Sequence, residues 1–163
     1  MRDALQKKCL GFSVTEIVIG AAIIAVVVTG VATAWQFYLK LAGQSTRMTQ
    51  ADLLIEEAGE ALQYIRDKGW DANIAPLALN TSYYLVWDGS DYVLTTTPTI
   101  INNAYTRIIS LRSVNRDASS NISSSGTNDP GTRLATISIY PNSSTTTAPI
   151  VQAQTLIHDV FSN

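Results

Sequence analysis

Cysteine is nearly absent from this chain of 163 residues, because Cys9 is the only one. The residues that follow it can therefore form no internal disulfide. Histidine is equally scarce, and His158 has neither a second histidine nor a nearby cysteine, which argues against a zinc site or a histidine-based triad. The sequence also lacks a glycine-rich phosphate loop and a carboxylate pair that suggests catalysis. We therefore expect a protein that is not an enzyme and that uses no cofactor.

Charge is sparse and unevenly placed. The formal net charge is −2, and no basic cluster interleaves with aromatic residues, so nucleic acid is not an expected direct ligand. No charged residue stands between Glu16 and Lys40, whereas the chain after Asp117 is rich in Ser, Thr and Asn. This asymmetry predicts an anchor followed by an exposed domain.

The uncharged run at residues 17–39 is long enough to cross a membrane. As a helix with a rise of ~1.5 Å per residue it measures about 34 Å, which spans a hydrocarbon core of about 30 Å. Basic residues precede it, so the positive-inside bias keeps the N-terminus cytoplasmic and places the rest outside. These basic residues are Arg2, Lys7 and Lys8.

Glu16, at the head of this run, separates the possible interpretations. A simple anchor and a secretory signal peptide are two of them, and Ala32-Thr33-Ala34 fits a small-x-small cleavage site. Cleavage after Ala34 would release a secreted binding domain. However, inserting a charged carboxylate into the membrane costs roughly 2.5 to 3.5 kcal/mol at its centre and less near the interface. Neither a simple anchor nor a signal peptide has a use for a glutamate at this position.

Residues 7–16, with the sequence KKCLGFSVTE, and the apolar run after them resemble the N-terminal motif of type IV prepilins and pseudopilins. The motif has a basic leader, a glycine before the cut (Gly11), an aromatic residue after it (Phe12) and a glutamate as the fifth residue of the product (Glu16). The resemblance, closest to bacterial minor pilins, implies that a prepilin peptidase cleaves between Gly11 and Phe12 and methylates the new amine of Phe12.

The resemblance also implies a place for the protein. The precursor lies in the bacterial inner membrane, with its leader cytoplasmic and its head outside, and later joins an extracellular or periplasmic filament. Its partners are the peptidase, membrane lipid before assembly, the inner-membrane assembly machinery and other pilin subunits. The resemblance implies a minor pilin or pseudopilin, with a major pilin as the alternative.

Glu16 gains a physical role once the leader is removed. Cleavage creates a positive amine on Phe12 near the membrane surface, and a buried carboxylate needs such a partner. In a bundle of staggered helices, the amine of an incoming subunit can pair with Glu16 of its neighbour and set the axial register. The alternative is a Glu16 that only snorkels to the headgroups.

Beyond the membrane segment, apolar residues recur at helical spacing and form one stripe. We expect this amphipathic helix to end near Lys68-Gly69, with a left-handed glycine after its last turn. The predicted plan is an α+β fold with a leader at 1–11, a membrane-spanning helix at 12–40, its amphipathic continuation at 41–69 and a β-rich head at 70–163. The stripe consists of Leu41, Met48, Ala51, Ile55, Ala58, Leu62 and Ile65.

The head is predicted to be an antiparallel meander packed on this stripe. Asp88-Gly89-Ser90 favours a tight hairpin between the first two strands, while Pro98 and two loops at 117–131 and 141–149 separate the others. Many pilins close a C-terminal loop with a disulfide, which this chain cannot do. The expected strands are 82–87, 92–97, 105–114, 133–140 and 151–161.

Few polar side chains of the head suggest a ligand. Asp117, Asn121 and Asp129 offer oxygen atoms of the kind that calcium prefers, but the region lacks the acid density and final glutamate of a calcium loop. We expect a solvated loop there. We expect His158 to be a partly buried strand residue. The remaining aromatic residues, expected in the core or the hairpin, are Trp70, Trp87 and Tyr92.

Overall fold

The computed structural model describes residues 13–142 and 148–160, and it has the α+β class expected from the sequence. Two helices and six strands follow one another along these described residues. They are α1 (Val14–Asp67), α2 (Trp70–Asn73), β1 (Tyr84–Trp87), β2 (Tyr92–Thr95), β3 (Tyr105–Arg116), β4 (Ile122–Ser123), β5 (Thr127–Pro141) and β6 (Val151–His158).

The chain comprises two compact units, Met1–Ser45 and Thr46–Asn163. In the first unit, the described residues from Val14 onward are all helical and form the N-terminal part of α1. The second unit, the head, contains the C-terminal part of α1 together with α2 and all six strands. The head core therefore consists of helix and sheet residues.

The C-terminal part of α1 packs on the sheet through small and aliphatic side chains. Ala51, Ala58, Leu62 and Ile65 of the predicted stripe are buried, and the alanines allow a close approach of helix to sheet. The stripe does not extend as far toward the N-terminus as predicted, because Met48 is 54% exposed. Leu41 is exposed as well. Ala51 is the first buried residue of α1, and it packs with Tyr105 and Ile139.

The helix ends where the sequence indicated. The Lys68 N–H donates to the Tyr64 carbonyl at 3.1 Å, and the Gly69 N–H donates to the Arg66 carbonyl at 3.0 Å, which tightens the last turn. Gly69 has a φ of 141°, so a glycine is required there. This conformation is not the left-handed helical one that was expected, although it serves the same purpose of stopping the helix.

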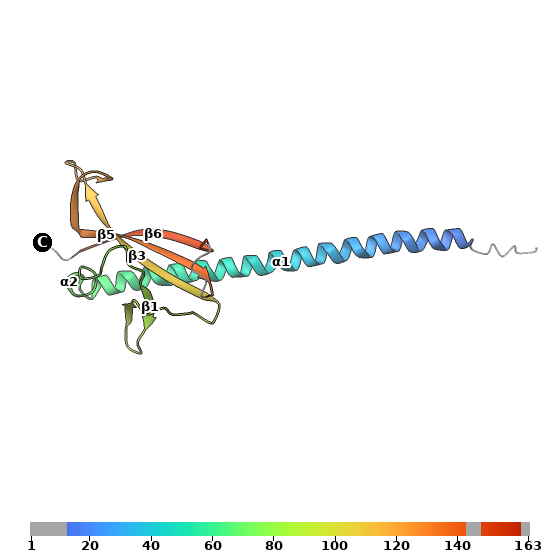
Figure 1. The fold of residues 1–163 in the computed structure, drawn as a ribbon, viewed down its shortest axis with the longest axis horizontal. Coiled ribbons are helices and arrows are strands. Elements are labelled where there is room, and N and C mark those ends of the chain that lie inside the picture. Colours follow the sequence, from blue (N-terminus) through green and yellow to red (C-terminus); the bar gives the residue numbers. More distant parts are fainter. Residues whose placement is uncertain (1–12, 143–147, 161–163) are drawn as a thin grey trace, which may run out of the picture. The chain divides into compact units, whose positions relative to one another are not determined.

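The strands form two sheets, so the prediction of a single meander is wrong. A four-stranded antiparallel sheet has the order β4-β3-β5-β6, and β1 and β2 form a separate hairpin. An isolated bridge between Tyr83 and Ile109 joins the hairpin segment to β3. In Figure 1, β3, β5 and β6 run along the C-terminal part of α1.

The predicted turn between β1 and β2 is confirmed. Trp87 and Tyr92 are opposite each other at the end of the ladder, and the Asp88 carboxylate accepts hydrogen bonds from the backbone N–H groups of Ser90 and Asp91 at 2.9 and 2.8 Å. An aspartate that binds the backbone two residues ahead is a typical turn former. Gly89 supplies a φ of 105°.

The segment predicted as a loop at 117–131 is partly strand. It contains β4 and the first residues of β5, which extends the β3–β5 pairing to Thr127 opposite Arg116. The ladder shifts register between Ser113 and Val114, and Figure 1 shows β5 bending sharply. Such an irregularity admits Pro130, which cannot donate to a ladder, so the proline did not mark the end of the strand.

The single-residue expectations have mixed outcomes. Trp70 is buried in the core, while Trp87 and Tyr92 belong to the hairpin, as predicted. His158 ends β6 but is exposed, so the prediction of partial burial is wrong. The reason is its register: in β6 the neighbouring Ile157 points to the core, and side chains alternate between the two faces.

Candidate functional site

The first turn of α1 carries Glu16, the residue that decided the sequence interpretation. Glu16 Oε2 accepts a hydrogen bond from the Ser13 backbone N–H at 3.0 Å. Ser13 Oγ in turn accepts a hydrogen bond from the Thr15 N–H at 3.3 Å. This is a variant of the capping box in which the serine hydroxyl bonds to the second helical residue instead of the third, and it satisfies N–H groups that have no partner at a helix start. Sequence reasoning missed this local role, although Ser-x-x-Glu is its signature.

The capping hydrogen bond leaves acceptor capacity on the Glu16 carboxylate for a further donor. An ionised carboxylate has two oxygens that can together accept about four hydrogen bonds, and the cap uses Oε2 alone. Gly11 and Phe12, the expected cleavage and methylation residues, lie outside the described part of the chain. Their roles stay predictions from the motif.

The helical part of the first unit, from Val14 onward, exposes many large apolar side chains. In α1, the segment after Glu16 is long and apolar enough to cross a membrane by length and composition. Its two threonine hydroxyls are satisfied within the helix: Thr29 Oγ1 donates to the Ala25 carbonyl at 2.9 Å, and Thr33 Oγ1 to the Thr29 carbonyl at 2.8 Å. Hydroxyl groups that are bonded to the backbone in this way are compatible with hydrocarbon. The exposed large side chains include Val18, Ile19, Ile23, Ile24, Val27, Val28 and Val31.

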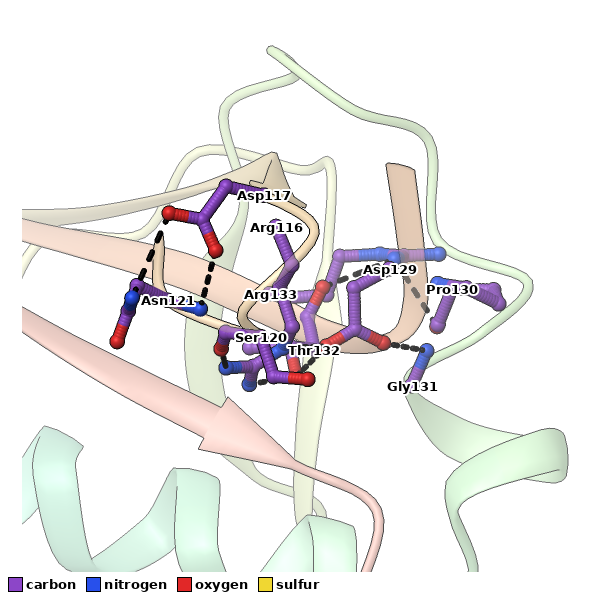
Figure 2. Close-up of polar contacts among 9 residues, drawn as sticks. All are labelled: Arg116, Asp117, Ser120, Asn121, Asp129, Pro130, Gly131, Thr132 and Arg133. Carbon is purple, nitrogen blue, oxygen red and sulfur yellow. Dashed lines mark hydrogen bonds and ion pairs between the residues drawn. The ribbon is translucent and has the colours of Figure 1, made fainter. Parts of the chain in front are cut away.

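The three residues considered for calcium do not share a ligand set. Figure 2 shows the Asp117 carboxylate turned toward its own loop, where Oδ1 accepts the backbone N–H groups of Asn121 at 2.9 Å and Ser119 at 2.8 Å. These backbone bonds, that of Asn121 first, hold the pKa of Asp117 below its usual range. The carboxylate stabilises this turn.

Asp129 lies apart from Asp117 and faces a cation of the protein itself. Its Oδ2 accepts Arg116 Nε at 2.6 Å and Thr132 Oγ1 at 2.7 Å, while Oδ1 accepts the Gly131 N–H at 3.0 Å (Figure 2). The Arg116 guanidinium is the main cause that lowers the pKa of Asp129. Across residues 13–142 and 148–160, no three His, Cys, Asp or Glu side chains gather to hold a metal. The Asp129 cluster joins β3 to the irregular part of β5.

No protein-family model, curated protein or solved structure matches this chain at a significant level. The function therefore has to be argued from the motif at residues 7–16 and from the exposed apolar helix that follows it.

Proposed function

We propose that the chain is a structural subunit of a filament assembled from the bacterial inner membrane, as a minor pilin or pseudopilin. The observation that carries this proposal is Glu16 at the head of an exposed apolar helix, directly after a basic leader with Gly11 and Phe12. In this proposal a prepilin peptidase removes residues 1–11, the helix remains in the membrane, and the head lies on the outer side of the membrane.

Assembly then transfers the apolar helix from lipid to a bundle of like helices. Both environments are apolar, so contacts between helices and polar pairing decide whether the bundle forms. The amine on Phe12 of an incoming subunit pairs with the Glu16 oxygen that the cap leaves available on its neighbour. A charge-assisted hydrogen bond between buried partners is strong and fixes one axial register.

The α+β head supports a structural role better than a catalytic one. Its polar clusters are used internally, as the Asp88 turn, the Asp117 turn and the Asp129 cluster demonstrate. The head folds around the C-terminal part of α1 without a disulfide, through the buried alanines and Leu62.

Co-purification with filaments tests this proposal. Tagged protein should be recovered in sheared filaments from cells that contain the prepilin peptidase, and should stay in the membrane fraction when the peptidase is removed. Gly11→Asp should strand the precursor in the membrane in the same way, whereas Gly43→Ala, a change in α1 with no atom within 4 Å of the added carbon, should be assembled normally. Recovery of the whole protein as a soluble secreted species would contradict the proposal.

A further inference from the structure

A small groove with aromatic walls lies on the head, between the C-terminal part of α1 and the hairpin β1–β2. Its volume is about 290 Å³. Trp87 is 58% exposed and Tyr64 is 45% exposed, so the head presents a large aromatic surface to solvent. The groove is lined by Glu57, Glu60, Ala61, Tyr64, Trp87 and Tyr92.

The aromatic rings are held in place. Trp87 and Tyr92 make an edge-to-face pair with ring centroids 5.2 Å apart. The Tyr92 hydroxyl donates to Glu57 at 3.3 Å, and the Tyr64 hydroxyl donates to Asp91 at 2.6 Å. Each tyrosine is thus anchored by its hydroxyl, and the three rings form a preformed wall that needs little ordering on binding.

Two acidic side chains around the groove are paired with basic side chains, and one is not. Arg107 Nη1 pairs with Glu57 at 2.8 Å, and Lys68 Nζ pairs with Asp91 at 2.5 Å. Within residues 13–142 and 148–160, the Glu60 carboxylate has neither an ion pair nor a hydrogen bond. The groove therefore has one negative charge that no positive group of the head matches.

The sequence of α1 reinforces this imbalance, since no basic residue stands between Arg47 and Arg66. The ring of Tyr64 already accepts one cation, because Lys68 Nζ lies 5.6 Å from its centroid. The acidic residues of this stretch are Asp52, Glu56, Glu57 and Glu60.

We propose that this groove binds a lysine or arginine side chain of a partner polypeptide. Aromatic faces beside a carboxylate attract organic cations, and the apolar stem of such a side chain can cover the rings. A polypeptide is the fitting source because β2 pairs only with β1 among the described strands, so an extended segment can add to its outer edge. The inference does not depend on leader cleavage or filament assembly.

Peptide titration of the full chain in maltoside micelles tests this site. Three tryptophans give three indole N–H signals in the spectrum of the ¹⁵N-labelled protein, and Trp87→Leu identifies that of Trp87. The probe is acetyl-Val-Lys-Val-amide, and its control has norleucine in place of lysine. The lysine peptide should shift the Trp87 signal saturably, and the norleucine peptide should not.

Two variants of similar exposure distinguish the site from general charge attraction. Glu60→Gln should weaken lysine-peptide binding about two- to fivefold, as expected for an exposed ion pair. Glu56→Gln, a change of an exposed glutamate that does not line the groove, should leave it unchanged. Equal binding of both peptides, or equal loss in both variants, would overturn the proposal. If ethylammonium bound as tightly as the lysine peptide, the inference that the occupant is a polypeptide would be wrong.

Discussion

Replacing Glu16 by glutamine separates its local role from its role between subunits. A glutamine at this helix position can still accept the Ser13 N–H and complete the capping box, but it has no charge to offer an amine. Alanine removes both the cap and the charge. The two variants should therefore differ in the stability of the helix start in the isolated chain. Both should be incorporated poorly into the filament.

The size of each effect follows from the contacts. Loss of a cap such as the 3.0 Å bond from Ser13 to Glu16 destabilises a helix start by about 0.5 to 2 kcal/mol, and loss of the negative charge alone by about 0.3 to 1 kcal/mol. Removal of one member of a buried ion pair costs about 3 to 5 kcal/mol, which is about a hundredfold or more in an assembly constant.

The assay compares two measurements on each variant. Amide hydrogen exchange in the first turn of α1, measured in micelles, should accelerate more for Glu16→Ala, which loses the cap and the charge, than for Glu16→Gln, which loses the charge alone. The amount of subunit in sheared filaments, relative to the membrane pool, should fall about a hundredfold for both. Ser13→Ala, which removes the hydroxyl cap and keeps the charge, should speed exchange without depleting the filaments. Wild-type levels of the Glu16→Gln protein in filaments would refute the pairing mechanism.

Three further predictions concern the head. A fragment starting at Leu41 should be soluble and unfold in one cooperative thermal transition, because helix–sheet packing lies within it, and an aggregated product would contradict this. Arg116 holds the pKa of Asp129 below the ordinary value of 3.8, so this carboxylate stabilises the head above that pH and ceases to do so as the pH falls through its lowered pKa. Asp129→Asn should therefore reduce the drop in Tm between pH 5 and about pH 2, and an unchanged drop would count against the cluster. Gly126→Ala should lower the Tm, because the added carbon would collide with the Arg116 carbonyl, whereas Gly59→Ala, with open space in a helix, should stabilise by about 0.5 to 1 kcal/mol. The opposite order in thermal melts would be inconsistent with the structure.

The spacing of apolar residues and the presence of turn-forming residues were sufficient to predict several regular features of the fold. The apolar spacing around Ala58 and Leu62 predicted the packed face of α1, and Gly69 marked its end. Asp88 predicted the turn between β1 and β2. These features depend on neighbours within a few residues, which sequence patterns record directly.

The errors arose where tertiary contacts decide the outcome. Pro130 and Gly131 indicated a loop, but the pairing of β5 with β3 accommodates them at an irregularity, which Asp129 and Arg116 stabilise from different strands. Met48 continued the apolar stripe in sequence, yet the folded head leaves it 54% exposed. Neither result is encoded in local spacing.

The candidate sites show the same division. The Ser13–Glu16 cap is local and could have been predicted from Ser-x-x-Glu. The groove beside Trp87 could not, because it joins α1 to a hairpin more than twenty residues away and depends on which carboxylates already have partners.

The first residue of the mature protein tests the central claim most directly. Intact-mass measurement and N-terminal sequencing of the protein from cells that assemble the filament should find Phe12 as the first residue, with a methylated amine and the apolar helix retained. A mature chain that begins at Trp35 would show cleavage after Ala34 and would replace the filament subunit with a secreted domain.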